Sequence, residues 1–248
     1  GSSCPIAWPD TVLNVIVADS LAFIADELEK RAGANPSEKK LEAAVKGLLK
    51  EIVRSHRAVV FDGDNYSEQW HAEAERRGLP NLRSTPDALM TLKSRPASQL
   101  FSRYKVLSAR ELKARVEVLQ EQYITQLQIE ARTMLQMLET QVLPAAIRYQ
   151  SELAGSLAAV RAVDLDSPAT ADRLEELIQH ATELRKAVES LKAAEAREFA
   201  SVDKHAQFMR EHLVPAMDAC RTAADRLEQI VPEDTWPLPS YSEMLFVR

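Results

Sequence analysis

The chain has 248 residues, of which 46% are hydrophobic and 27% are charged, the balance of an ordinary folded protein. Its formal net charge of −6 is spread along the chain without a basic stripe, which argues against nucleic acid as a partner. The sequence contains no apolar run long enough to cross a bilayer, and its start lacks the pattern of a secretory signal. These features favour a cytoplasmic protein that does not bind membranes.

The composition also predicts a mostly α fold. Good helix formers dominate, and there are only 6 glycines against 12 prolines. The two cysteines, Cys4 and Cys220, are far apart and match no metal-ligand spacing, so we expect reduced thiols.

The first two predicted elements are amphipathic helices that form a hairpin. Asp10 is expected to cap a helix that ends near Gly33, with a wide apolar face that should be deeply buried. Ser37 and Glu38 begin a second helix that runs to about His56. The apolar positions of the two helices are Val12, Leu13, Ile16, Val17, Leu21, Ile24, Ala25, Leu28, Leu41, Val45, Leu48, Leu49 and Ile52.

Shorter elements follow the hairpin. Residues 58–61 form a short apolar run and are the best strand candidate, ended by the turn-forming residues 62–65. Ser67 is expected to cap a short helix to about Arg77. Thr85-Pro86 and Arg95-Pro96 place proline where a first helical turn tolerates it, so two more short helices are predicted.

A long and regular apolar pattern begins at Ser108 and predicts one helix that extends to about Val160. Its mean spacing of about 3.7 residues favours a straight helix or slight right-handed coiling, and Pro144 should kink it. The pattern consists of Leu112, Val116, Leu119, Tyr123, Leu127, Ala131, Met134, Leu138, Val142, Ala145, Tyr149, Leu153, Leu157 and Val160. The methionines within the helical patterns, Met134, Met137, Met209 and Met217, are interpreted as core residues.

Two further seams predict that the C-terminal half is an antiparallel bundle. Asp166-Ser167-Pro168 breaks and restarts the helical pattern, and Pro215 lies inside the last seam. The seam residues are Leu174, Leu177, Ala181, Leu184, Val188 and Leu191, then Met209, Leu213, Ala216, Cys220, Ala223, Leu227 and Ile230. Residues 143–146 and 214–217 share a Pro-Ala core that hints at duplication. Residues 236–241 predict an extended tail packed on a surface, and 244–247 a strand.

Candidate sites for chemistry are few. The turn of residues 62–65 has oxygen ligands and is followed by Glu73 at the twelfth position, but its glycine falls second instead of sixth, so a helix-capping turn is favoured over a calcium loop. The five histidines, His56, His71, His180, His205 and His212, show no metal spacing. A nucleophile motif and a glycine-rich phosphate loop are also missing from the sequence. We therefore predict no catalytic, cofactor-binding or metal-binding residue in this chain.

Several ordered stretches resemble type III glutamine synthetases. They are Val60 to Trp70, Glu75 to Leu82, Thr85 to Leu89, Glu121-Gln122-Tyr123, Ile129-Glu130-Ala131, Thr133-Met134, Leu143-Pro144-Ala145 and Trp236 to Tyr241. Gly1-Ser2-Ser3 with Pro9 to Asn14 resembles the stretch that follows the last active-site strand of that family, although the family favours Asn where this chain has Asp10. The resemblance covers nearly the whole chain.

This resemblance implies an enzyme that uses ATP and divalent cations such as magnesium to ligate ammonia to glutamate, with its active site upstream of Gly1. It further implies that residues 1–107 complete the catalytic domain, that residues 108–248 form a C-terminal helical extension, and that subunits assemble into double rings. The chain alone is predicted to be inactive and structural, with the rest of its subunit and ring neighbours as partners. As an isolated fragment it should expose the surface from Leu13 to Leu28 and self-associate. The alternative is a free-standing helical module, derived from that family, that binds another protein through residues 236–241 or a bundle seam.

Overall fold

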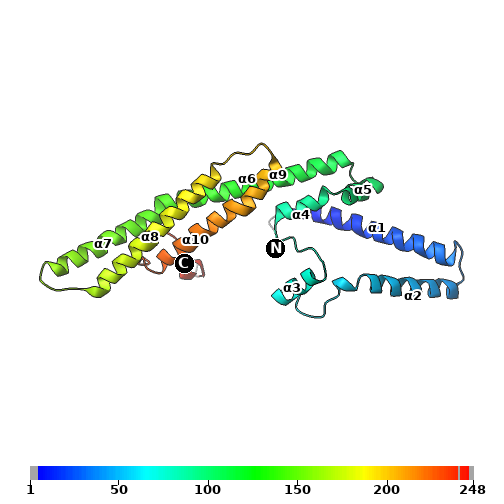
Figure 1. The fold of residues 1–248 in the computed structure, drawn as a ribbon, viewed down its shortest axis with the longest axis horizontal. Helices are drawn as coiled ribbons and strands as arrows, with labels where there is room; N and C mark the ends of the chain where they lie inside the picture. Colours follow the sequence, from blue (N-terminus) through cyan, green and yellow to red (C-terminus); the bar gives the residue numbers. More distant parts are fainter. Residues whose placement is uncertain (1–4, 240, 246–248) are drawn as a thin grey trace. The chain divides into compact units, whose positions relative to one another are not determined.

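The computed structural model describes residues 5–239 and 241–245, and it confirms the mostly α fold (Figure 1). The chain forms two compact units, residues 1–116 and residues 117–248, and the boundary falls within helix α6 (Ala109–Met137). Over the described ranges no helix is both long and apolar enough to cross a membrane. The two units are described separately below.

The first unit opens with the predicted helical hairpin, formed by α1 (Ala7–Ala32) and α2 (Glu38–Ser55). Helix α1 begins one turn earlier than expected, because Pro9 lies in the first turn, where its missing N–H is not needed. The helix ends as predicted at Gly33, whose positive φ of 83° suits a residue without a side chain. Arg31 of α1 then bonds both carboxylate oxygens of Glu51 on α2, at 2.9 and 2.8 Å.

Three short helices complete this unit, as the sequence predicted: α3 (Glu68–Arg76), α4 (Thr85–Leu92) and α5 (Arg95–Arg103). Each has a serine N-cap whose hydroxyl accepts a hydrogen bond from a backbone N–H in the first turn. A small core joins α1 to α5 and to the start of α6, through Val15, Phe101 and Leu112. Trp8 stacks on Phe101 with 5.9 Å between the ring centroids.

The strand predicted for residues 58–61 is wrong. Residues Arg57–Val59 form a single 3₁₀ turn, η1, and the chain leaves it in an irregular loop. A strand needs a neighbouring strand to satisfy its backbone groups, and none lies beside it in the described part of the chain. The side chain of Arg77 instead donates to the carbonyl oxygens of Ala58 and Val60, at 3.0 and 2.7 Å.

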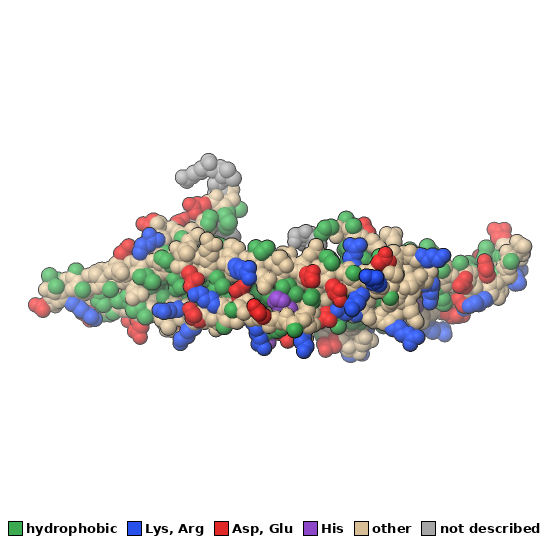
Figure 2. All heavy atoms as spheres, turned by 90° about the horizontal axis from the view of Figure 1, so that it is seen from above, with side chains coloured by type: hydrophobic (Ala, Val, Ile, Leu, Met, Phe, Trp, Pro, Cys, Tyr) green, Lys and Arg blue, Asp and Glu red, His purple; other side chains and the backbone are tan. Residues whose placement is uncertain are grey.

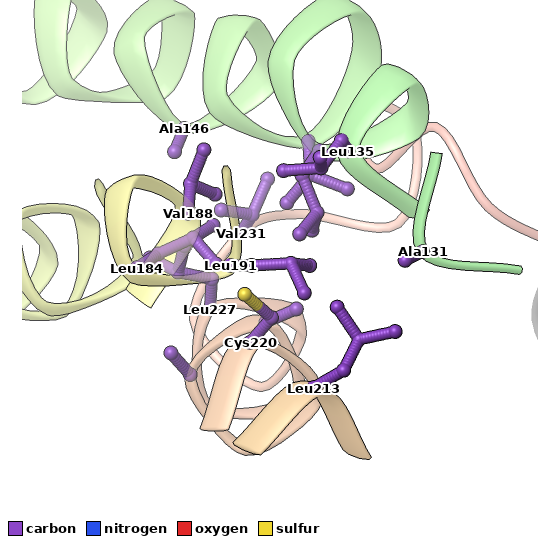
Figure 3. Packing of buried hydrophobic residues seen from close by; sticks show 14 of the residues in the cluster. Ala131, Leu135, Ala146, Leu184, Val188, Leu191, Leu213, Cys220, Leu227 and Val231 are labelled. Carbon is purple, nitrogen blue, oxygen red and sulfur yellow. The ribbon is translucent and has the colours of Figure 1, made fainter. Parts of the chain in front are cut away.

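The second unit is the predicted antiparallel bundle. Helix α8 (Pro168–Glu195) lies between α7 (Leu143–Arg161) and α10 (Val214–Glu228) and packs on both. Figure 3 shows Leu184, Val188 and Leu191 of α8 among side chains from the neighbouring helices. Leu191 has 0% of its surface exposed and belongs to the largest buried cluster, with Leu135, Ala146, Leu213, Cys220 and Leu227. This core gives the C-terminal unit its own stability.

Both internal prolines of the bundle follow a π turn. The turn η2 (Leu138–Val142) precedes Pro144, and η3 (Met209–Leu213) separates α9 (Val202–Phe208) from Pro215. Proline cannot donate to the carbonyl four residues earlier, and its ring would clash with that carbonyl. A π turn relieves the clash, and in each case the residue before the proline donates to a carbonyl five residues back. The long predicted helix is therefore α6, η2 and α7 in succession, and the two Pro-Ala sites share one local structure.

The tail after α10 packs on the bundle of its own chain. Trp236 and Leu238 are half-buried against the main core, and the N–H of Trp236 bonds the carbonyl of Pro232 at 2.9 Å. The strand predicted for residues 244–247 is wrong where it can be compared, because α11 (Tyr241–Leu245) is helical; residues 246–247 lie outside the described residues. The described residues contain no sheet that this segment could join, so local helical bonds satisfy its backbone.

Candidate functional site

A hollow of the first unit lies between the η1 loop and helix α3, and its volume is about 630 Å³. It is an open cavity with a mixed lining of charged, polar and apolar groups. The lining residues are Arg57, Ala58, Val60, Phe61, Asp62, Gly63, Gln69, Glu73, Arg76 and Arg77. We call this hollow the η1–α3 pocket. Most of it falls in the stretch whose sequence is similar to type III glutamine synthetases.

Local hydrogen bonds fix the loop that forms one wall of the pocket. The Asp64 carboxylate accepts a bond from the N–H of Tyr66 at 2.9 Å, and the Ser67 hydroxyl donates to the carbonyl of Asp64 at 2.6 Å. Ser67 also caps α3 by accepting from the N–H of Trp70. The side-chain oxygens of this turn therefore serve the backbone, as a turn of this composition predicts.

An aromatic and cationic stack holds the loop against α3. The rings of Phe61 and Trp70 stack with centroids 4.6 Å apart, and the guanidinium of Arg77 lies 5.6 Å from the centroid of the Trp70 ring. The same guanidinium bonds two carbonyl oxygens of the loop. Arg77 thus joins an ion pair, a cation–π contact and two backbone acceptors, which makes the wall rigid.

Glu73 accepts hydrogen bonds from both arginines at the end of α3. Arg76 donates to its two oxygens at 2.7 and 2.6 Å, and Arg77 donates at 2.5 Å. The hydrogen bonds from Arg76 and then Arg77 lower the pKa of Glu73 to about 2. One ionised carboxylate is therefore shared by two arginines, which leaves a net charge of +1, and the three side chains form a structural clamp.

Gly63 is required by the close approach of Phe61. A Cβ at this position would lie 2.6 Å from the Phe61 ring, so Gly63→Ala must displace the ring from Trp70. We expect this substitution to destabilise the first unit by about 1–3 kcal/mol, the usual cost of overpacking. Urea unfolding followed by Trp70 fluorescence, with Trp8 and Trp236 replaced by Phe, measures the effect. Gly155→Ala is the matched control, because its Cβ meets nothing within 4 Å and helix α7 should gain up to about 1 kcal/mol. Equal effects at the two sites would refute the close-contact explanation.

The clamp predicts a specific acid response. The pKa of Glu73 is lower in the folded chain than its usual 4.5, so its stabilisation is complete above pH 4.5 and is lost as the pH falls towards 2. Glu73→Gln should therefore flatten the acid fall of the unfolding free energy between those two pH values. Denaturant titrations at stepped pH measure this slope. The control is Glu75→Gln, which removes an exposed carboxylate that makes no ion pair with the described residues from the same helix. If Glu75→Gln changed the slope as much as Glu73→Gln does, the assignment to Glu73 would be contradicted.

The histidines are spread over several elements, and His205 and His212 belong to one aromatic cluster with Phe199 and Phe208. His56 ends α2, His71 lies on α3, and His180 on α8 contacts Glu183 at 3.1 Å. His205 and His212 stack on different rings, Phe199 and Phe208 respectively. Within residues 5–239 and 241–245 there is no group of three side chains able to hold a metal ion, and the 62–65 turn gathers none. The absence of catalytic and metal-binding residues stays a prediction.

A second surface of interest is one side of helix α1. Leu13, Ile16, Val17, Leu21 and Phe23 lie on the same side of the helix, and each has about half or more of its surface exposed, with Leu21 at 61%. We call this set the α1 apolar face. The chain itself does not supply the deep burial expected for α1, since only Val15 and Ala32 of the helix are buried. The exposure expected for this surface in the chain alone is found.

The polar side chains of α1 near this face bond to its own backbone. Thr11 donates to the carbonyl of Ala7, Asn14 to that of Asp10 and Ser20 to that of Ile16, at 2.8, 2.8 and 3.0 Å. These groups already have acceptors, so covering the face would leave few of their hydrogen bonds unmade. On the side of the molecule seen in Figure 2, acidic and basic side chains are interspersed, and green apolar side chains lie between them.

Comparison with known proteins decides the family. A family model described as the glutamine synthetase C-terminal domain matches residues 44–161. The type-3 glutamine synthetase of Dictyostelium discoideum is 34% identical over 256 aligned residues, which include the whole chain and 34% of that relative. The glutamine synthetase of Bacteroides fragilis is 30% identical, again over the whole chain and 35% of its own length. This chain belongs to the glutamine synthetase family.

It corresponds to the C-terminal region of these glutamine synthetases. The chain spans about a third of the length of the curated relatives it matches. The glutamine synthetase of Butyrivibrio fibrisolvens, 30% identical, covers 83% of the chain with 30% of its own length. The resemblance seen in the sequence is confirmed. The pocket itself was missed, although Glu73 and Arg77, four residues apart on one helix, are a signal for an ion pair.

Proposed function

We propose that this glutamine synthetase region has a structural role in an enzyme that uses ATP and magnesium to ligate ammonia to glutamate in the cytoplasm. The observation that carries this role is the α1 apolar face. A helix with apolar residues on both sides is normally buried on both sides, and one side of α1 is covered within this chain. The α1 apolar face then packs against the remainder of the same subunit.

In this proposal, residues 1–107 complete the catalytic domain and residues 108–248 form a helical extension that supports assembly of the subunits. The reacting groups, the nucleotide and the metal ions belong to the remainder of the subunit. In the pocket, Arg76 and Arg77 both donate hydrogen bonds to Glu73. These side chains are therefore engaged with one another, which favours a structural role for them.

The alternative is a free-standing module that binds another protein through the tail or a bundle seam. The contacts of Trp236 and Leu238 with the bundle of their own chain weigh against the tail as a free recognition segment. The seam residues Leu184, Leu191 and Leu227 are equally engaged within the bundle, at 0% exposure.

An activity assay tests the proposed role. The purified 248-residue chain should show no glutamate-dependent ATP hydrolysis in the presence of ammonia and magnesium. Addition of the separately produced remainder of the enzyme should restore glutamine synthesis. Turnover by the chain alone, or full activity of the remainder without it, would overturn the proposal.

A further inference from the structure

A row of aromatic rings holds the connection between α8 and α9, an irregular loop of residues 197–200 (Figure 1). The rings of Phe199 and His205 stack with centroids 4.9 Å apart, and the centroids of Phe199 and Phe208 are 4.8 Å apart. His212 stacks on the Phe208 ring at 4.6 Å. The guanidinium of Arg197 lies over both phenylalanine rings, 5.5 and 4.9 Å from their centroids. We call these five side chains the ring stack.

The ring stack joins the connection to the start of the next helix. Residues 197–200 form no helix or strand, so side-chain contacts have a large part in placing them. Phe199 packs on Phe208 of α9, which is only 9% exposed. The first turn of α9 also depends on the stack, because its N-cap residue Ser201 makes no side-chain capping bond. Loss of the stack should therefore loosen both the connection and the beginning of α9.

His205 is the histidine of the stack that is poorly placed to carry a charge. Its Nε2 atom is buried and has no hydrogen-bond partner among the described residues. A neutral imidazole tolerates this when Nε2 is the acceptor nitrogen, whereas an imidazolium has an N–H at both nitrogens. Protonation would then bury a charged donor without an acceptor, and burial accordingly lowers the pKa of His205. His212, by contrast, is exposed.

The surrounding charges do not remove this cost. Arg197 already lies over the Phe199 ring, so a protonated His205 would share that ring with a second cation. Burial is the cause of the lowered pKa of His205, and no carboxylate among the described residues raises it. The other charged side chains on the adjoining elements are Glu195, Glu198, Asp203, Lys204, Arg210 and Glu211. Glu195 is paired with Arg132 at 2.5 Å, and Arg210 with Glu211 at 3.1 Å.

We propose that the ring stack is an acid-sensitive latch, which holds residues 197–200 and the start of α9 in place while His205 is neutral and releases them when His205 is protonated. The pKa of His205 is below its usual 6.5 in the folded chain. The stabilisation by the stack is therefore complete above pH 6.5 and is lost as the pH falls through the lowered pKa. The latch lies in the second unit and does not depend on the α1 apolar face or on assembly.

Hydrogen exchange of the 248-residue chain tests the latch. Exchange of residues 202–213 is measured at about pH 7.5 and about pH 5, and is corrected for the pH dependence of exchange in an unstructured peptide. These residues should lose about 10-fold in protection at the lower pH, where the latch is open. Helix α7 lies in the same unit, contains no histidine and is the internal reference, so its protection should not change.

Two substitutions of His205 separate the proton from the ring. His205→Phe and His205→Gln should both abolish the pH dependence, because neither side chain gains a proton in this range. His205→Phe keeps an aromatic ring in the stack, so it should also retain protection at both pH values. His212→Gln, at the exposed end of the stack, is the matched control and should leave the pH response unchanged. Circular dichroism checks that the helices of each variant are intact.

Equal protection of residues 202–213 at the two pH values in the parent chain would overturn the inference. A pH response that persists in His205→Phe, or that disappears in His212→Gln, would overturn it as well, because the proton would then belong to another group. An equal loss of protection in α7 would indicate general acid unfolding of the unit and would also contradict a local latch.

Discussion

Replacing Leu21 by Asp is expected to have opposite effects in the complete enzyme and in the isolated chain. In the complete enzyme the substitution places an unpaired carboxylate in the contact proposed for the α1 apolar face, at a cost of several kcal/mol. We expect loss of assembled enzyme and of glutamine synthesis by at least about 100-fold. In the isolated chain Leu21 is 61% exposed, so the substitution should reduce self-association and leave the unfolding midpoint unchanged. Sedimentation velocity on both forms, with activity of the complete enzyme, measures these effects.

Ile147→Asp is the matched control for this substitution. Ile147 has 55% of its surface exposed and lies on α7, which belongs to the second unit. The same change from an aliphatic side chain to a carboxylate there should leave assembly and activity near those of the parent enzyme. If Leu21→Asp were as harmless as Ile147→Asp in the complete enzyme, the α1 apolar face would have no partner in the subunit.

Leu191→Ala should cause the largest loss of stability in the bundle. Leu191 is fully buried between helices, and its truncation removes packing from the main core and leaves a cavity (Figure 3). Core truncations of this kind destabilise by about 2–5 kcal/mol. Urea unfolding followed by circular dichroism at 222 nm, the standard wavelength for helix, measures the change of the free energy of unfolding.

The control lies on the same helix. Ile178 of α8 is 42% exposed, so Ile178→Ala should cost less than about 1 kcal/mol. A cost for Leu191→Ala no larger than that for Ile178→Ala would contradict the packing of α8 between α7 and α10.

Helices were predictable from the sequence because periodicity and capping residues report on local bonds. Ser67 and Ser108 illustrate this: Ser67 caps α3, and Ser108 exchanges hydrogen bonds with Glu111 at the start of α6. The seams from Leu174 to Ile230 also predicted the bundle, since each helix must bury its apolar stripe. The sequence did not predict the π turns before Pro144 and Pro215. A helix can accommodate a proline, which lacks the N–H donor, either by a kink or by a π turn, and the sequence does not distinguish the two.

The failures share a physical cause. The segments 58–61 and 244–247 have strand-like composition, but a strand depends on a distant partner that the sequence does not reveal. The deep burial expected for α1 is not found within this chain for a related reason. Apolar periodicity indicates that a helix face is buried, but it does not indicate which part of the protein buries it. The pocket depends on contacts between Arg77 and the η1 loop, nearly twenty residues apart, and no local pattern encodes them.

Thiol labelling of the α1 apolar face is the most direct test of the central claim, that this face packs against the remainder of the glutamine synthetase subunit. Leu21→Cys, made in a chain with Cys4→Ser and with Cys220 left buried, places a single reactive thiol on the face. We predict fast reaction with a maleimide in the isolated 248-residue chain, diluted until it no longer self-associates, and strong protection in the native complete enzyme, lost on unfolding in urea. Equally fast labelling in both native forms would contradict the claim.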